Sequence, residues 1–343
     1  GYTDATHWLH LTLAASDQPV GLRITPPWVD EITLYDPSRP DHPFKAGDHH
    51  PEGSNAQESL GYVFLLPSSP QPRDLWLRLK STSTHRLSVV AFPMDQLMTA
   101  NTLATLWTSL YAALNLLILL VLIGVWWIRR EHVLGVYLVG HCFYSMFSLF
   151  YLGLPGLLLP TGIAPPGFID ATFSLLVITL PPVTLWFDIT LLKTYRPQRH
   201  LLRGLKCIAW ISLFPLGILL AGKTSLALQS VVLSFLVITA LVFAAALSTH
   251  PEPSVERLMP KKVMIGYYTL VFGSVYVGLF SVLGWIPAPN WTQHMLIVHG
   301  LVSGVAMVTI LLVRSQRLHH HHQQMAWQLQ KVQQDRSEER RVG

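Results

Sequence analysis

The sequence predicts a membrane protein that begins with a β-sandwich and continues as a bundle of seven transmembrane helices and a cytoplasmic helix. Half of its 343 residues are hydrophobic and only 13% are charged, whereas soluble domains usually carry about 25% charged residues. The second observation is a change from short alternating segments (1–96) to long apolar segments (97–315). The third is a polar, helix-prone tail (316–343) that has no fold of its own.

Residues 1–96 contain six segments typical of half-buried strands. In each, apolar and polar residues alternate, and Pro, Gly, Asp or Ser separates one segment from the next. This pattern predicts a β-sandwich, which we interpret as a jelly roll. The segments are HWLHLTLA (7–14), GLRITPP (21–27), DEITLYDP (30–37), GYVFLLP (61–67), DLWLRLKS (74–81) and RLSVVAFP (86–93).

Seven apolar stretches follow, each near the roughly 20 residues that a helix needs to cross a bilayer. Pro181, Pro182 and Pro215 fall inside the third and fourth stretches, where we expect them to kink the helices. The predicted spans are Leu103–Ile128, Val133–Leu152, Phe168–Leu191, Leu202–Leu220, Leu226–Leu247, Val263–Trp285 and Met295–Val313.

The basic residues predict the orientation of these spans. Only Lys223 lies in the loops on one side, and all the other loop and juxtamembrane Lys and Arg residues lie on the opposite side. By the positive-inside rule, the basic side is cytoplasmic, so the β-domain lies outside the cell and the tail inside. The net charge of +5 therefore requires no nucleic-acid partner. The residues on the basic side are Arg129, Arg130, Lys193, Arg196, Arg199, Arg203, Lys206, Arg257, Lys261, Lys262, Arg314 and Arg317.

Large aromatic residues are the ligand-binding candidates of the β-domain, because aromatic platforms suit sugar rings and other amphipathic molecules. We expect Trp8 and Trp76 in the core rather than at a ligand, and we leave both interpretations open for Trp28. His49 and His50 are candidates for a polar lip beside the platform. The domain shows no paired carboxylates, phosphate loop or nucleophile motif, so we predict no catalytic residue. The remaining aromatic candidates are Tyr35 and Tyr62.

Polar residues inside the spans are functional candidates, because burying them in a bilayer is costly. Asp170 and Asp188 lie toward the span ends, where we expect hydration. His141 and His299 are the more informative pair, and we favour hydrogen bonds between helices over ligand or proton sensing for them. Tyr144 and Tyr267 complete the set.

The tail carries a partial heptad pattern. Leu318, Met325 and Val332 are seven residues apart, and Leu329 lies four after Met325. This spacing favours a parallel dimeric coiled coil, with a solvated single helix as the alternative. The four histidines 319–322 offer only one pair on a helix face, so we predict neither a metal site nor a cofactor.

The order of these parts resembles the bacterial seven-transmembrane receptors with diverse intracellular signalling modules (7TMR-DISM). The resemblance rests on GYTDATHWLHLTLAASDQP with its Trp8-Leu9 pair, on Asp30 to Tyr35 within VDEITLYDP, and on YLVGHCFYSMFSLFYLGLPG. It implies a receptor of the bacterial inner membrane. Its periplasmic module would be similar to carbohydrate-binding domains. The expected ligand is a small or carbohydrate-like molecule, or a periplasmic protein.

The resemblance also implies an output domain, which we expect after Gly343. The Gln-rich tail resembles the linker of histidine kinases, so we favour a homodimeric kinase that signals to a response regulator, with a diguanylate cyclase as the alternative. A transporter or channel is a more distant rival. It predicts inverted repeats and a polar path through the spans, and the sequence shows neither. An intramembrane enzyme is disfavoured because no catalytic set is suitably spaced.

Overall fold

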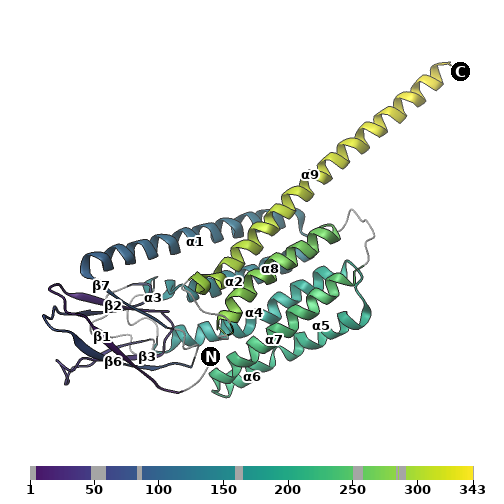
Figure 1. Ribbon diagram of the computed structural model, residues 1–343. Coiled ribbons are helices and arrows are strands. Elements are labelled where there is room, and N and C mark those ends of the chain that lie inside the picture. Colours follow the sequence, from purple (N-terminus) through teal and green to yellow (C-terminus); the bar gives the residue numbers. More distant parts are fainter. Residues whose placement is uncertain are drawn as a thin grey trace.

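The computed structural model describes residues 5–47, 59–82, 87–158, 165–249, 258–282, 285 and 291–342. Side chains are described up to Leu318 with few gaps, and beyond it only at Gln323 and Gln328. A β-domain lies at one end of a helical bundle, and the last helix projects well beyond the other end (Figure 1).

The β-domain consists of two antiparallel sheets that face each other, as predicted. One sheet has the order β1-β6-β3-β4 and the other β5-β2-β7. Apart from the β3–β4 hairpin, each strand crosses to the opposite sheet from the one before it. The strands are β1 (His7–Leu13), β2 (Val20–Thr25), β3 (Glu31–Tyr35), β4 (Phe44–Ala46), β5 (Tyr62–Leu66), β6 (Arg73–Lys80) and β7 (Ser88–Pro93).

The core between the sheets is made by the apolar half of the alternating pattern. Its fully buried members include Ile24, Ile32, Phe64, Leu75 and Leu77. β4 is the one described strand that the sequence pattern did not predict, because three residues are too few to show a period of two. It pairs with β3 through Ile32 and Ala46.

Two buried aspartates fix the loops at the ends of β3. Asp30 accepts hydrogen bonds from the Thr82 backbone N–H (2.9 Å) and the Ser81 hydroxyl (3.3 Å). Asp36 accepts one from the Ser38 backbone N–H (2.9 Å) and pairs with Arg73 at 3.1 Å. Buried carboxylates with several donors are stable, so this strand is held at both ends.

Seven helical segments of the described chain are long and apolar enough to cross a membrane, as predicted. The fourth is divided at Ser212 and Leu213, just before Pro215, whereas Pro181 and Pro182 lie within one continuous helix. The helices are α1 (Met94–Arg129), α2 (His132–Tyr151), α3 (Leu154–Leu158), α4 (Phe168–Lys193), α5 (Arg199–Ile211), α6 (Phe214–Leu220), α7 (Thr224–Leu247), α8 (Lys261–Val282) and α9 (Trp291–Val342).

The first helix is longer at its start than the apolar pattern indicated. α1 begins at Met94, directly after β7, rather than at Leu103. Its first turns contain Asp95, Gln96 and Thr99, which are too polar for a span but compatible with a helix. No linker therefore separates the β-domain from the bundle at this point.

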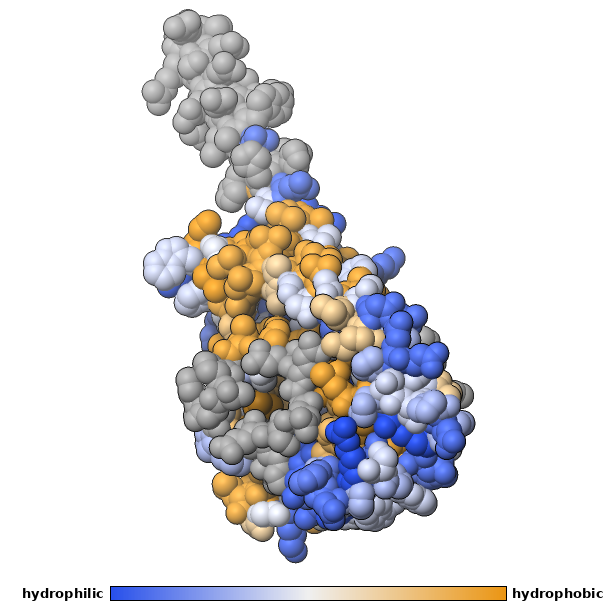
Figure 2. Space-filling view, turned by 90° about the vertical axis from the view of Figure 1, so that its left-hand side faces the viewer, coloured by the Kyte–Doolittle hydropathy of each residue, from blue (hydrophilic) through white to orange (hydrophobic). Residues whose placement is uncertain are grey.

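The seven membrane-spanning segments form a ring in which each packs against the next and α9 returns to α1. Much of the α1 surface is exposed and apolar, for example at Leu106, Leu117 and Ile128, as expected of a helix that faces lipid. Seen from the β-domain end, hydrophilic side chains gather on the β-domain and hydrophobic ones over the helices (Figure 2). The chain is thus a multi-pass membrane protein with a polar domain at one end.

Candidate functional site

The outward face of the four-stranded sheet carries a cluster of aromatic rings, which we call the aromatic face: Trp8, His10, Tyr35 and Trp76. The registers place Trp76 opposite His10 on one side and Tyr35 on the other. Trp8 stacks on Tyr35 with ring centroids 5.6 Å apart, and His10 stacks on Trp76 at 4.6 Å. Three neighbouring strands therefore build one continuous aromatic surface.

The expectation that Trp8 and Trp76 belong to the core is wrong. Trp8 is 55% exposed and Trp76 is 45% exposed. In β6 the buried residues are Leu75, Leu77 and Leu79, so Trp76 shares the opposite face with Asp74 and Arg78. In β1 the leucines turn inward in the same way, and Trp8 shares the outward face with His10.

Polar groups border the aromatic face. Asp74 accepts hydrogen bonds from the Thr12 hydroxyl at 2.8 Å and lies 3.1 Å from His10 Nε2. Arg78 pairs with Glu31 at 2.8 Å. Exposed rings bordered by hydrogen-bonding side chains suit ligands that have both apolar faces and hydroxyl groups. His49 and His50, the predicted polar lip, lie outside the described residues.

Trp28 does not belong to the aromatic face but joins the β-domain to the bundle. It lies in the loop between β2 and β3, is only 3% exposed, and stacks on Phe173 of α4 at 5.5 Å. Its ring also contacts Tyr151 of α2, with centroids 5.9 Å apart. The Trp28 side chain is therefore buried, but at the junction between the β-domain and the bundle rather than between the two sheets.

Tyr62 holds this loop in place rather than contacting the aromatic face. Its strand, β5, belongs to the other sheet, and its hydroxyl donates to the backbone carbonyl of Pro27 at 2.6 Å. On the bundle side, Gly153 adopts φ +79°, and a Cβ added there would lie 2.6 Å from Pro27 Cγ. Only glycine allows so close an approach with this backbone conformation.

A second contact joins the two parts where β7 runs into α1. Leu97, in the first turn of α1, is fully buried against Gly21 of β2. A Cβ added at Gly21 would lie 2.3 Å from Leu97 Cδ2. β2 is thus joined to α1 by direct packing, in addition to the chain connection between β7 and α1.

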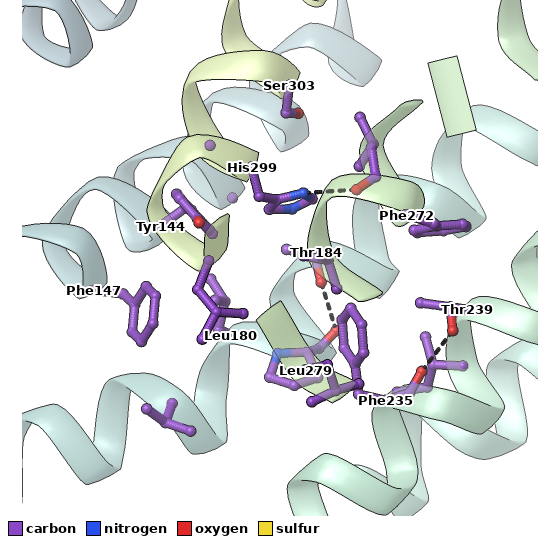
Figure 3. A pocket seen from close by; sticks show the side chains of 18 of the residues that line it. Tyr144, Phe147, Leu180, Thr184, Phe235, Thr239, Phe272, Leu279, His299 and Ser303 are labelled. Atoms are coloured by element: carbon purple, nitrogen blue, oxygen red, sulfur yellow. Dashed lines mark hydrogen bonds between the residues drawn. The ribbon is translucent and has the colours of Figure 1, made fainter. Parts of the chain in front are cut away.

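A cavity of about 230 Å³ lies between α2, α4, α7, α8 and α9. Tyr144, Phe147, Phe235, Phe272 and His299 are among the residues around it (Figure 3). Trp28 and Pro26 of the β-domain loop also line it. The cavity therefore begins at the domain junction and continues into the bundle.

The cavity brings together five of the six intramembrane candidates, all except Asp170. His141 and Tyr144 come from α2, Asp188 from α4, Tyr267 from α8 and His299 from α9. The sequence did not predict this convergence, since these positions are far apart along the chain.

The expectation that Asp170 and Asp188 are hydrated does not hold, because each is only 8% exposed. Asp188 accepts a hydrogen bond from the Tyr268 hydroxyl at 3.0 Å. Nearby, the hydroxyls of Tyr137 and Tyr267 lie 3.1 Å and 2.9 Å from Ser303 Oγ. These contacts tie α2, α8 and α9 together.

The two histidines differ in their partners. His299 Nδ1 donates to the backbone carbonyl of Val271 on α8 at 2.9 Å. This is a hydrogen bond between helices, the role that the sequence analysis favoured for this residue. His141 is 4% exposed, and its Nε2 has no hydrogen-bond partner among the described residues.

At the end of the bundle away from the β-domain, α9 is fixed to the other helices before it projects. Arg314 pairs with Glu131, at the start of α2, at 2.6 Å. Leu318 is partly buried, but the side chains of Met325, Leu329 and Val332, like those of the four histidines 319–322, lie outside the described residues. The predicted heptad contacts in the tail stay a prediction.

Comparison with known proteins identifies the β-domain. Residues 1–92 match the family described as 7TMR-DISM extracellular 2. No curated protein and no solved structure matches the chain. The matched region includes Trp8-Leu9 and the segment from Asp30 to Tyr35, on which the resemblance was based. The N-terminal domain of this membrane protein is therefore a 7TMR-DISM extracellular 2 domain, as the sequence predicted.

Proposed function

We propose that this chain is the sensory part of a bacterial receptor that couples a periplasmic ligand or partner to a cytoplasmic output domain. The observation that carries the proposal is the continuity of α9, which runs for 52 residues through the bundle and on into the tail. At 1.5 Å per residue this helix is roughly 78 Å long, far more than a bilayer requires. Such a helix transmits a shift or rotation at one end to the other.

The two junction contacts support the input side of this proposal. A ligand on the aromatic face would bridge β1, β6 and β3, and the Trp28 loop leads directly into β3. Ligand binding shifts a receptor only by the difference between its affinities for the two states. A change in the spacing of these strands would alter the packing of Trp28 against α2 and α4. Ligand binding outside would in this way change the packing of the bundle.

The output side of the proposal rests on charge and on the tail sequence. Lys and Arg gather at the α9 exit side, which the positive-inside rule places in the cytoplasm of a bacterial inner membrane. We propose a sensor domain (1–96), a seven-helix domain (97–315) and a signalling helix (316–343) that dimerises. The favoured output is a histidine kinase acting on a response regulator, and a diguanylate cyclase is the alternative.

A transporter is less well supported. The break between α5 and α6 would be the place for an unwound substrate site, but no residue of these two helices lines the described cavity. The cavity wall also includes no Lys or Arg among the described residues.

The proposed receptor predicts that the tails of two copies lie side by side. Cys142 and Cys207 would first be replaced by serine, and single cysteines placed at Met325 or Leu329 on the predicted core, or at Gln323 or Gln330, which the same heptad places on the outer surface. We expect disulfide cross-linking in membranes to be efficient at the core positions only, because they alone face the partner helix. Equal efficiency at all four positions would show solvated single helices instead.

The proposed ligand site predicts that Trp8→Ala and Trp76→Ala weaken ligand binding without unfolding the domain. Each ring is about half exposed and stacks on one neighbour, so we expect the free energy of unfolding to fall by only about 1 kcal/mol. Loss of a central aromatic contact should weaken binding at least about tenfold. Titration of the full chain in nanodiscs with cellotriose, maltotriose and chitotriose measures this.

The matched control for these two variants is Val90→Ala, an exposed apolar position on the other sheet. It should leave binding unchanged. If a sugar binds equally well to Trp8→Ala and to the unaltered chain, the aromatic face is not its site. If none of the three sugars binds, the carbohydrate ligand is withdrawn and a periplasmic protein becomes the candidate.

A further inference from the structure

One residue that lines the cavity inside the bundle, His141, has a ring nitrogen without a hydrogen-bond partner in the part of the chain that the structure describes. His141 Nε2 is buried, and no described residue donates to it or accepts from it. The ring is held in place by stacking on Tyr137, with centroids 5.8 Å apart, and by Gly304, where an added Cβ would lie 2.9 Å from His141 Cε1. Buried polar atoms usually have a partner, so this one points to a group that is supplied from outside the chain.

His299 presents a second hydrogen-bonding group at the same cavity. Because its Nδ1 faces the Val271 carbonyl oxygen at 2.9 Å, the proton of the neutral ring must lie on Nδ1. Its Nε2 is then an acceptor, and it has no hydrogen bond to any described residue. An incoming group must therefore donate a hydrogen bond to His299. A hydroxyl can do so, and its oxygen can at the same time accept a hydrogen bond from His141 Nε2 in the tautomer that carries the ring proton there.

The other residues that line the cavity indicate the chemical character of the rest of the ligand. Phe147, Phe235, Phe272, Leu180 and Leu279 give it an apolar and partly aromatic surface (Figure 3). The described wall offers no Lys or Arg side chain to an anion. Its one acid, Asp188, already accepts a hydrogen bond from Tyr268. A neutral molecule with an aromatic ring fits this surface better than an ion does.

We propose that the bundle binds a small neutral phenol or aromatic alcohol, with its ring against the aromatic wall and its hydroxyl at His299 and His141. A neutral molecule of this kind partitions into lipid and reaches a site between helices from the bilayer. Trp28 lines the same cavity, so the cavity borders the β-domain as well as the bundle. The site is separate from the aromatic face and does not depend on what binds there.

Three small ligands test the proposal on the full chain in nanodiscs: 4-ethylphenol, ethylbenzene and 2-phenylethylamine. They share a ring of similar size but differ in carrying a hydroxyl, no polar group or a cation. We expect saturable binding of 4-ethylphenol, and about threefold to tenfold weaker binding of ethylbenzene, which lacks the hydrogen bond. Equal affinity for these two, no saturable binding of the phenol, or tighter binding of the amine would each overturn the proposal.

Two kinds of variant locate the binding. Leu279→Trp fills the cavity and should abolish saturable binding, whereas Leu120→Trp, on the exposed surface of α1, should not. His299→Leu should lower the affinity for 4-ethylphenol to that for ethylbenzene and leave ethylbenzene binding unchanged. Unaltered phenol binding in both Leu279→Trp and His299→Leu would show partition into lipid or another site. If Leu279→Trp does not fold, the ligand comparison and His299→Leu still decide.

Discussion

Replacing Gly300 with alanine is expected to destabilise the bundle by about 3 kcal/mol, the upper end of the cost of overpacking. A Cβ at this position would lie 2.0 Å from Cε1 and 2.4 Å from Cδ1 of Tyr144. The Tyr144 ring packs against Phe147 and His299, so it can move away only by giving up these contacts. We expect lower yield of folded protein and a lower melting temperature in detergent, and Gly300→Val should be worse.

Two glycines of α8 provide matched controls. At Gly266 and Gly273 an added Cβ would have no neighbour within 4 Å, and both positions are exposed. Because alanine stabilises a helix relative to glycine by roughly 0.5–1 kcal/mol, these substitutions should be neutral or slightly stabilising. Similar melting temperatures for Gly300→Ala and Gly266→Ala would contradict the close packing of α9 on α2.

The same argument extends to Gly304, where an added Cβ would lie 2.8 Å from Ile118 Cγ2 of α1. Gly300 and Gly304 form a small-xxx-small pair, which lets membrane helices approach closely. The two glycines bound the segment GLVSG (300–304). Their spacing predicts a packing face of the helix.

In the β-domain, the alternation of apolar and polar residues predicts both the strands and the face on which each side chain lies. The strands were predictable because each alternates in step with a buried face, and the same alternation shows which way the tryptophans point. Trp8 shares its phase with His10 and Thr12, and Trp76 shares its phase with Asp74 and Arg78. Hydrophobicity favoured the core for both residues, but phase places them outside, because the leucines already fill the inward positions.

Other features could not be predicted from local patterns. Trp28 is buried against Phe173, which lies far from it in the sequence, so its partner depends on how two separate parts pack. The cavity likewise requires five helices to converge. The seven spans were predictable because each helix must by itself present apolar side chains and satisfy its backbone hydrogen bonds in the bilayer. Their mutual arrangement depends instead on contacts such as that of Gly300 with Tyr144.

Replacing Trp28 with alanine is expected to cost about 3–5 kcal/mol of stability at the domain junction, as for other large aromatic residues in a core. Trp28 is not part of the core between the two sheets, which is formed by residues such as Ile32 and Leu77. The β-domain should therefore keep its fold and its ligand affinity. What should be lost is the response of the tail, measured as the change in cross-linking at Met325 when ligand is added.

Trp8→Ala is the complementary variant, because it should lose ligand affinity while leaving the junction intact. At ligand concentrations high enough to saturate its weakened site, its tail should still respond, whereas the tail of Trp28→Ala should not respond at any concentration. A normal tail response in Trp28→Ala would move the route of coupling to the other junction, where Leu97 packs on Gly21. Leu97→Ala would then be the variant that separates binding from response, because removing its side chain leaves β2 and α1 joined only through β7 and the backbone.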